Sequence, residues 1–367
     1  MKIGIDAKWY FEGPPSGKVV VRNLVENLVT LFPNHQFYIF LDKRFKSQPI
    51  SFQQKNVTIV YMWGKVNLIA NALWFPIVAW KYKLDVAVLQ NFAPLVSNFH
   101  SIVFIHDVIF ESDPHHFSLT ERLYFFPMKF LAKRSQRVCT VSKNEKKRLL
   151  QYGYGNESNI DVIYNGVAAQ YKPLNSFPDD IIQQVKQKYQ LPEKYLLYVG
   201  RLNDRKNLKN LIESLTYLNE KTIPLLLFGS YDWKSINLDE IIERHNLQRR
   251  VFRKGFADQE DLPIIYSLAT VFTFVSYEEG FGLPILEAMA SGVPCVVADT
   301  PVFRELFSDC VVYTNPHDPN DIATKISLLI ADKNMYDDKK ENGLILSKKF
   351  SWEQSAKKLI EVVESMK

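Results

Sequence analysis

The chain has 367 residues, of which 47% are hydrophobic, and this is enough for the cores of two domains. No stretch reaches about 18 consecutive apolar residues, and the beginning MKIGIDAKWY follows a strand pattern, so we expect neither a transmembrane helix nor a secretory signal. The net charge of +5 is uneven, because residues 1–171 carry 20 Lys and Arg against 12 Asp and Glu, while residues 172–367 carry 25 against 28. The basic first half predicts an anionic partner for that half. We do not expect this partner to be a nucleic acid.

The first half alternates strand-like and helical patterns. Its expected strands are short apolar runs at 2–6, 37–41, 57–60, 86–89, 102–105, 138–141 and 160–163. Helical spacing fills most of the gaps between them, beginning with the apolar positions from Val19 to Val29. This alternation predicts a doubly wound α/β domain over residues 1–171.

Two loops of this domain carry candidate site residues. The Gly- and Pro-rich loop 12–17 follows the first strand, so the amide of Gly17 could approach a phosphate or an acceptor, although such a loop guarantees a turn more firmly than a site. His106 follows the strand 102–105 and faces the crevice, where it could hydrogen-bond a reacting sugar or be a structural histidine. Asp107 could orient this histidine or cap the following turn.

The segment 61–83 carries three tryptophans and a long apolar face, with Lys65, Lys81 and Lys83 at its edges. A buried core helix is the default interpretation. The alternative is a helix at a membrane interface, with aromatic rings and lysines at headgroup level. The basic stretch 129–148 could meet anionic lipid, or it could be a solvated face.

A second α/β series follows a connection at 170–192 that is rich in proline and charge. Its expected strands lie at 195–199, 225–228, 251–252, 271–275, 294–298 and 311–313. We therefore expect a second Rossmann-like domain at 172–350 and a final amphipathic helix within 351–367. Two successive domains of this kind place a ligand in the cleft between them. The cysteines Cys139, Cys295 and Cys310 stand singly, which indicates a reducing cytoplasm and no metal or disulfide framework.

The most informative stretch is EEGFGLPILEAMASG at 278–292, which reads as a glycine loop between a strand and a helix. Backbone amides and a helix N-terminus at the carboxyl end of a strand bind polyanions. Glu279 and Glu287 stand eight positions apart, and carboxylates beside a phosphate site make sense when they accept hydrogen bonds from hydroxyls. A sugar nucleotide offers both groups. The alternative is that the two are ordinary glutamates near a helix start.

Gly200, Arg201 and Lys206 follow the first strand of the second domain. A planar guanidinium and a mobile ammonium at this place suit the capture of a diphosphate. In a transferase they would neutralise charge growing on the departing nucleotide diphosphate. The alternative is a solvated basic loop.

At these residues the chain resembles the family 4 (group 1) glycosyltransferases, whose fold is named GT-B. The resemblance is carried by Glu279-x7-Glu287 with its glycine loop, Gly200-Arg201 with Lys206-Asn207, the run 162–167, His106-Asp107, and Phe350-Ser351-Trp352-Glu353. The last of these looks like the start of the family's final helix, which crosses back to the first domain. The loop Pro14 to Lys18 departs from the Gly-x-Gly of many relatives.

The resemblance implies transfer from a nucleotide-diphosphate sugar with retention of anomeric configuration, without a metal site and without a cofactor. Glu279 would contact hydroxyls of the donor sugar, Glu287 the ribose, Arg201 and Lys206 the diphosphate, and His106 the sugar near the reacting centre. The donor site would also include Gly17, Gly200, Gly280, Phe281, Gly282 and Leu283.

No carboxylate of the first domain is placed as a covalent nucleophile. The hypothesis is therefore attack on the face from which the nucleotide departs, with the leaving diphosphate oxygen helping to deprotonate the acceptor hydroxyl. Contacts to the base are expected from the loops 228–231 and 252–256. The basic first domain and the segment 61–83 point to a lipid-diphosphate-linked glycan acceptor in bacterial surface polysaccharide synthesis, at the inner face of the cytoplasmic membrane.

Other classes of protein remain as alternatives. A nucleotide-sugar hydrolase, epimerase or phosphorylase on the same fold would have a similar donor site, and a non-catalytic protein could bind a nucleotide sugar without turnover. A Rossmann oxidoreductase is disfavoured, because no Gly-x-Gly-x-x-Gly follows a strand.

Overall fold

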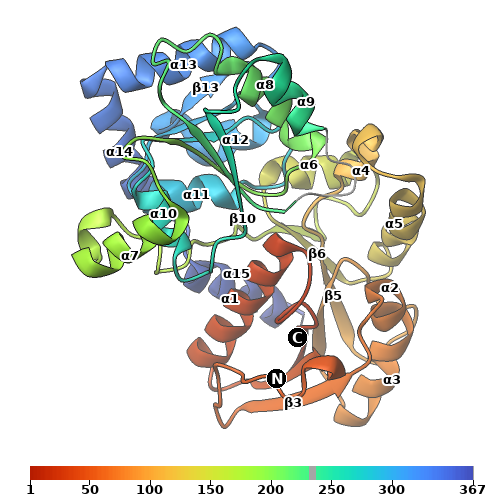
Figure 1. Ribbon diagram of the computed structural model, residues 1–367. Coiled ribbons are helices and arrows are strands. Elements are labelled where there is room, and N and C mark those ends of the chain that lie inside the picture. Colours follow the sequence, from red (N-terminus) through yellow and green to blue (C-terminus); the bar gives the residue numbers. More distant parts are fainter. Residues whose placement is uncertain (231–236, 367) are drawn as a thin grey trace. The chain divides into compact units, whose positions relative to one another are not determined.

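The computed structural model describes residues 1–230 and 237–366, and the chain divides into two compact units (Figure 1). Unit 1 comprises Met1–Gly166 with Ser351–Lys367, and unit 2 comprises Val167–Phe350. The division thus falls at Val167, five residues before the position 172 that the connection 170–192 indicated. The connecting residues 167–171 belong to unit 2.

Among the described residues, unit 1 is built on a seven-stranded sheet in the order β3-β2-β1-β4-β5-β6-β7. All neighbouring strands pair in parallel. The strands are β1 (Lys2–Asp6), β2 (Gln36–Asp42), β3 (Val57–Met62), β4 (Val86–Gln90), β5 (His100–Phe104), β6 (Arg137–Thr140) and β7 (Ile160–Val162). Their continuous apolar runs are explained by helices on both faces of the sheet.

The helices of unit 1 include α1 (Pro15–Leu31), α4 (Ile109–Ser112), α5 (Leu119–Ala132), α6 (Lys143–Gln151) and α15 (Trp352–Glu364), with short turns η1 (Lys43–Phe45) and η4 (Pro114–His116). α5 begins at a capping box, in which Ser118 Oγ accepts from the Glu121 amide at 3.1 Å and Glu121 accepts from the Ser118 amide at 2.7 Å. This reciprocal pair fixes where the helix starts.

The final helix α15 packs against α1 and belongs to unit 1 although unit 2 precedes it in the chain. Ser355 Oγ donates to the Tyr164 carbonyl at 2.6 Å, and Trp352 is buried. The run 162–167 and the ending at 350–353, two motifs far apart in sequence, therefore meet in space.

Among the described residues, unit 2 is built on a six-stranded parallel sheet in the order β10-β9-β8-β11-β12-β13. Its strands are β8 (Leu196–Val199), β9 (Leu225–Phe228), β10 (Val251–Gly255), β11 (Val271–Phe274), β12 (Cys295–Ala298) and β13 (Val312–Thr314). Its helices include α7 (Asp179–Tyr189), α8 (Leu208–Ser214), α9 (Leu238–Arg244), α10 (Leu262–Ser267), α11 (Leu283–Ala290), α12 (Pro301–Phe307), α13 (Pro319–Ala331) and α14 (Lys333–Ser347), with turns η5 (Leu174–Ser176), η6 (Asp204–Lys206) and η7 (Ser308–Cys310).

Each sheet has a point where the strand order reverses, between β1 and β4 in unit 1 and between β8 and β11 in unit 2. Ligands of open α/β sheets bind at the carboxyl ends of the strands at such a point. Gly17 lies in α1, the helix that follows β1, and Gln90 is the last residue of β4. Lys206 lies in η6 after β8, and Glu279 lies in the loop after β11. Gly17, Lys206 and Glu279 thus follow strands that flank a reversal, whereas His106 follows β5, the next strand beyond β4.

The segment 61–83 is helical from Asn67 to Tyr82, and only one side of this run is buried, so the default interpretation of a buried core helix holds in part. It consists of α2 (Asn67–Ile69), a π-helical turn η2 (Ala70–Trp74), α3 (Phe75–Ala79) and a 3₁₀ turn η3 (Trp80–Tyr82). One side is buried, at Ala70, Phe75 and Ala79, and the other exposes large apolar side chains. None of the described helices is sufficiently long and hydrophobic to traverse a bilayer.

Candidate functional site

The loops after β8 and β11 meet in an ion-paired cluster. Lys206 Nζ contacts Glu279 Oε1, and Arg205 Nη1 lies 3.4 Å from Glu279 Oε2 and also donates to the Glu278 carbonyl. Lys206 is only 8% exposed and its Nζ lies 5.0 Å from the centre of the Phe274 ring. Two of the predicted residues, Lys206 and Glu279, are therefore direct partners, and Arg205 is a third member that the sequence pattern did not single out.

The cluster holds more positive than negative charge. Burial, helped by the nearby charges of Arg205 and Arg201, lowers the pKa of Lys206 to about 8 against the raising effect of Glu279. Burial alone would raise the pKa of Glu279, but the charges of Lys206 and Arg205 outweigh it and the pKa is lowered. Glu279 is accordingly an anion at neutral pH, and the surplus of cations suits an anionic ligand.

Backbone conformation and one asparagine fix the position of Lys206. The next residue, Asn207, has a left-handed backbone with φ of 56° and is buried. Its Nδ2 donates to the Val275 carbonyl at 3.0 Å and to the Pro316 carbonyl at 2.6 Å. The turn η6 is thereby tied to the end of β11, so Lys206 and Glu279 are held in a shared frame.

Gly282 starts α11 in a conformation that other residues avoid. Its φ is +110°, and a Cβ added there would lie 2.9 Å from the Phe303 ring. The glycine loop Gly280, Phe281 and Gly282 therefore leads into the amide of Leu283 through a turn that requires this glycine.

We expect Gly282→Ala to lower the free energy of unfolding of unit 2 by about 1–3 kcal/mol. In the variant, alanine would be strained at this positive φ and its Cβ would come too close to the Phe303 ring. Gly343→Ala is the matched control, since its Cβ would meet Met289 no closer than 3.4 Å inside helix α14. Thermal unfolding should show a loss for the first variant and none for the second. Equal stability of Gly282→Ala and the parent would contradict the assignment of strain.

Glu287 lies inside α11 in a different environment from Glu279. Tyr266 Oη donates to its Oε2 at 2.8 Å, and the Tyr171 hydroxyl bonds the same carboxylate. Burial raises the pKa of Glu287 to about 7, against the lowering effect of these two hydrogen bonds. The carboxyl therefore exchanges its proton near neutral pH, and its contribution to stability is present below the ordinary pKa of 4.5 and is lost as the pH rises through about 7.

The pH dependence of donor binding should follow this group. If ribose hydroxyls donate to the ionised carboxylate, affinity for a nucleotide-diphosphate sugar should fall about tenfold from pH 8 to pH 6, while Glu287→Gln should bind more weakly with no such slope. Isothermal titration with an intact sugar nucleotide is the measurement, since its diphosphate carries no group that titrates in this range. A parent protein with no pH slope would contradict the role of Glu287.

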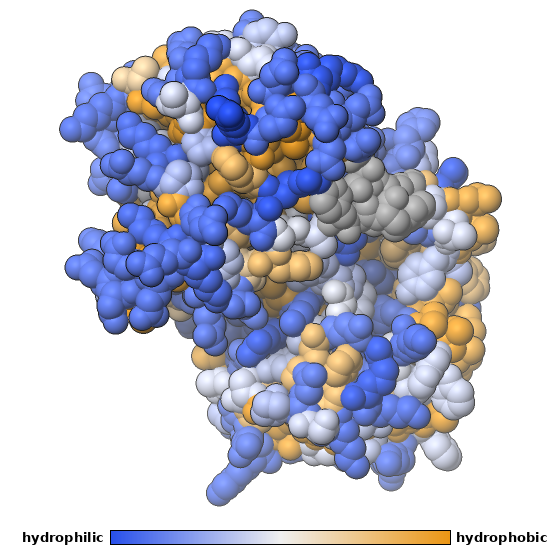
Figure 2. All heavy atoms as spheres, in the orientation of Figure 1, coloured by the Kyte–Doolittle hydropathy of each residue, from blue (hydrophilic) through white to orange (hydrophobic). Residues whose placement is uncertain are grey.

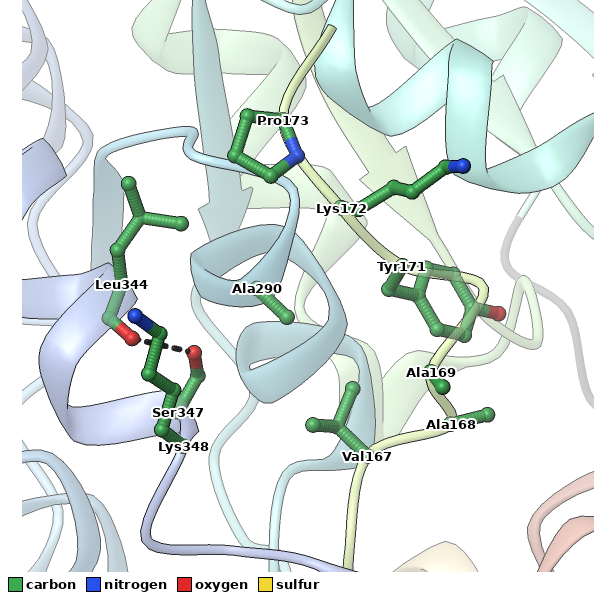
Figure 3. A pocket seen from close by; sticks show the side chains of 10 residues that line it. All are labelled: Val167, Ala168, Ala169, Tyr171, Lys172, Pro173, Ala290, Leu344, Ser347 and Lys348. Atoms are coloured by element: carbon green, nitrogen blue, oxygen red, sulfur yellow. Dashed lines mark hydrogen bonds between the residues drawn. The ribbon is translucent and has the colours of Figure 1, made fainter. Parts of the chain in front are cut away.

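A cavity of about 310 Å³ lies in unit 2 beside this carboxylate's partner Tyr171 (Figure 3). It is lined by Val167, Ala168, Ala169, Tyr171, Lys172, Pro173, Ala290, Leu344, Ser347 and Lys348. The Tyr171 hydroxyl points away from Ala290. None of the predicted donor-site or catalytic residues lines this cavity, so it is distinct from the cluster around Glu279.

In unit 1, His106 is held by Gln90 rather than by Asp107. Its Nε2 lies 2.9 Å from Gln90 Oε1, and its ring lies 5.1 Å from the Phe104 ring and 5.8 Å from the Trp9 ring. Asp107 instead accepts from the Ile109 amide at 3.3 Å, which is the turn-capping alternative. Burial lowers the pKa of His106 to about 4, with Asp107 opposing, so the imidazole is neutral at pH 7.

Gly17 lies within the first turn of α1, because the helix begins at Pro15 and the expected loop 12–17 ends earlier. A Cβ on Gly17 would lie 2.8 Å from the Trp9 ring. Gly17 therefore makes room for Trp9, which in turn flanks His106. Trp9 is a site residue that no sequence pattern indicated.

A buried polar network reaches His106 through Gln90, and the sequence did not reveal it either. The Lys8 ammonium contacts Asp6 Oδ1 and Asn71 Oδ1. Asn71 Nδ2 donates to Asp6 Oδ2 at 2.8 Å and to the Gln90 carbonyl at 2.9 Å. Because Gln90 also bonds His106, the network links the end of β1 and the turn η2 to the imidazole.

The structure gives the positions of further predicted residues. Arg201 is exposed on the loop after Gly200, on the β8 side of the cluster. Phe252 and Phe256, in the expected base-binding region, are 39% and 72% exposed, whereas Tyr231 lies outside the described residues. Within residues 1–230 and 237–366 no three His, Cys, Asp or Glu side chains form a group that could hold a metal ion.

Comparisons with known proteins agree with this architecture. A family model described as Glycosyltransferase Family 4 matches residues 18–171, and one described as Glycosyl transferases group 1 matches residues 180–346. The O-antigen chain mannosyltransferase B of Escherichia coli is 35% identical over 226 residues, which are 60% of this chain and 58% of that protein. The chain thus matches little more than half the length of this curated relative.

Solved structures resemble the whole chain. Sucrose-phosphate synthase from Thermosynechococcus elongatus matches with a TM-score of 0.79 and 19% identity, covering 100% of this chain and 99% of that one. The Anabaena protein HepE, in complex with UDP and glucose, matches with a TM-score of 0.76 and 20% identity, covering 100% of both chains. At these identities the likeness establishes the fold. With the two family models it shows that the chain belongs to the family 4 (group 1) glycosyltransferases and has their GT-B fold.

Proposed function

We propose that the protein transfers a sugar from a nucleotide-diphosphate sugar to a hydroxyl of a glycan acceptor, in bacterial surface polysaccharide synthesis. The observation that carries the proposal is the cluster of Lys206, Arg205 and Glu279 at the strand-order reversal of unit 2. It offers cations for a diphosphate and an ionised carboxylate for sugar hydroxyls, which are the two halves of a sugar nucleotide.

Each residue has a defined task in this proposal. Lys206 and Arg201 stabilise the negative charge that grows on the departing diphosphate. Glu279 accepts hydrogen bonds from the donor sugar, and Glu287 from the ribose. His106 contacts the sugar near the reacting centre as a neutral imidazole, and this state is supported by the lowering of its pKa through burial.

We further propose retention of anomeric configuration, without a metal ion or cofactor. The acceptor oxygen forms its bond to the anomeric carbon on the face from which the diphosphate oxygen leaves, and that oxygen takes the acceptor's proton. Lys206 and the amides at the start of α11 supply the charge stabilisation that a divalent cation would otherwise give.

The named relatives narrow the substrates to test. The Escherichia coli relative is named a mannosyltransferase of the O-antigen chain, and the Anabaena structure holds UDP and glucose. GDP-mannose and UDP-glucose are therefore the first donors. The acceptor class is a glycan linked to a lipid diphosphate, reached from the cytoplasmic side of the membrane.

Product analysis tests the proposal and separates it from its rivals. The purified protein is incubated with each donor, with and without acceptor, in the presence and absence of a chelator. We expect an acceptor-dependent glycoside, unaffected by the chelator, whose anomeric configuration by NMR matches that of the donor. Sugar release without acceptor would instead indicate a hydrolase, an altered donor sugar would indicate an epimerase, and binding without turnover would indicate a non-catalytic protein.

A further inference from the structure

Helix α5 exposes a stripe of large apolar side chains. Leu119, Leu123, Phe126 and Phe130 are between 58% and 80% exposed, and their spacing places them on one side of the helix. The opposite side of α5 is packed into the core through Met128 and its neighbours. The stripe is therefore additional to what the fold of unit 1 needs.

The segment 67–82 exposes a second apolar set. Ile69, Leu73, Trp74, Ile77 and Trp80 are between 40% and 70% exposed, while the other side of the segment is buried. Exposed side chains of this size on two elements exceed the scattered apolar residues normal for a soluble surface.

The two sets lie in neighbouring parts of unit 1. The Leu95 amide donates to the Ala72 carbonyl at 3.0 Å, and Arg134 Nε donates to the Leu95 carbonyl at 3.0 Å. The Arg134 guanidinium in turn lies 5.6 Å from the centre of the Phe130 ring. Leu95 itself and Val96 are exposed between the two elements. Within unit 1, α2, α3 and α5 follow one another along one side (Figure 1).

We call this surface the apolar–basic face, defined by the exposed apolar residues of 69–80, 95–96 and 119–130 and the cations around them. The exposed cations are Lys65, Lys81, Lys83, Arg122, Lys133 and Arg134. Residues 61–83 contain no acidic residue, and residues 119–137 contain only Glu121, which is engaged in the capping box of α5. Figure 2 shows orange, hydrophobic spheres gathered over α5 at the edge of unit 1, with hydrophilic spheres beside them.

We propose that the apolar–basic face docks unit 1 on an anionic lipid bilayer. The use of this docking, access to a lipid-linked acceptor, rests on the proposed function. Leu and Phe side chains would enter the acyl boundary, Trp74 and Trp80 would lie at the level of the headgroups, and the lysines and arginines would meet lipid phosphates. Charge decides between a bilayer and a second copy of the chain. A symmetric dimer through this face would bring its cations against each other, whereas anionic headgroups complement them.

The docking segment also reaches the interior network. Asn67 and Asn71 point inward from the same turns that expose Leu73 and Trp74, and both side-chain amides donate to the Gln90 carbonyl at 2.9 Å. Gln90 holds His106. A bilayer on the outer side of 67–80 would therefore lie one layer of structure away from the imidazole, a suitable place for an acceptor whose lipid stays in the membrane.

Vesicle flotation of the full chain tests the proposal. Vesicles of phosphatidylglycerol with phosphatidylethanolamine are compared with vesicles of phosphatidylcholine alone. The apolar variant is Phe126→Ser with Phe130→Ser, and its control is Ile345→Ser, whose side chain is 53% exposed on α14 of unit 2. The charge variant is Lys81→Glu with Lys133→Glu, and its control is the exposed Lys333→Glu on α14.

We expect the parent to float with anionic vesicles, less with neutral ones, and less in high salt. The partition onto anionic vesicles should be lower by about tenfold or more for both double variants and unchanged for the control variants. Equal binding to both vesicle types, or full binding by the double variants, would overturn the proposal. A parent protein that is a dimer, and that becomes a monomer in the Phe126→Ser with Phe130→Ser variant, would also overturn it. Transfer to a water-soluble acceptor is measured in parallel, so loss of activity with intact flotation counts against the proposed function alone.

Discussion

Lys206→Ala is expected to lower kcat/KM for glycosyl transfer by about 10²–10³-fold, because it removes a buried cation from the place where the departing diphosphate gains charge. The fold should survive, since Glu279 keeps Arg205 as a partner at 3.4 Å. The kcat/KM of Lys206→Arg should lie between those of the parent and Lys206→Ala, because a guanidinium keeps the charge but changes its reach and hydrogen-bond geometry.

The matched control for this prediction is Lys209→Ala. Lys209 is three residues further along the chain and exposed on α8, with the same side chain and charge. Initial rates at subsaturating donor should be close to parental for this variant. If both lysine variants were equally active, or equally impaired, the assignment of the diphosphate to the cluster of Lys206 and Glu279 would be wrong.

Asp6→Ala is expected to lower the free energy of unfolding of unit 1 by about 3–5 kcal/mol, because it leaves the buried ammonium of Lys8 without its carboxylate. Burial already lowers the pKa of Lys8, while Asp6 and Asp42 raise it. Removing Asp6 should lower that pKa further and strip Asn71 of one acceptor. Urea unfolding measures the loss, and hydrogen exchange of the amides in β1 and β4 locates it in unit 1.

Two further variants make this prediction specific. Asp6→Leu combined with Lys8→Met should recover most of the lost stability, because a buried ion pair replaced as a whole by apolar groups costs little. Asp258→Ala removes a carboxylate that pairs with Lys188 on the exposed surface of unit 2, and the unfolding midpoint should barely move. A double variant as unstable as Asp6→Ala would contradict the isolated-charge explanation.

The sheets were predictable because each strand of a parallel sheet is covered on both faces and so appears as a short continuous apolar run. The runs expected at 37–41, 86–89 and 271–275 are β2, β4 and β11, with no end shifted by more than one residue. Lys206 and Glu279 were predictable for a related reason. Both lie in the connections that leave the carboxyl ends of strands, and the strand order brings these two connections together.

The partners of these residues were not predictable, because they depend on contacts between distant positions. Tyr266 meets Glu287 from α10, and Gln90 meets His106 from the end of β4, with no local pattern to announce either pair. The interpretation of 61–83 as a buried core helix holds only for one side of the helical segment 67–82. Its apolar residues are too many for one buried face, so a buried side and an exposed side coexist along one helical run that contains a π-helical turn.

The most direct test of the central claim is a thermal-shift panel of UDP-, GDP-, ADP- and CDP-sugars on the parent protein and on Lys206→Ala. We predict that one nucleotide class stabilises the parent and that the shift disappears in the variant, because the diphosphate is held by Lys206 beside Glu279. An equal shift in both proteins would place the nucleotide elsewhere. No shift with any sugar nucleotide, in the presence of acceptor as well as in its absence, would contradict a donor site in unit 2.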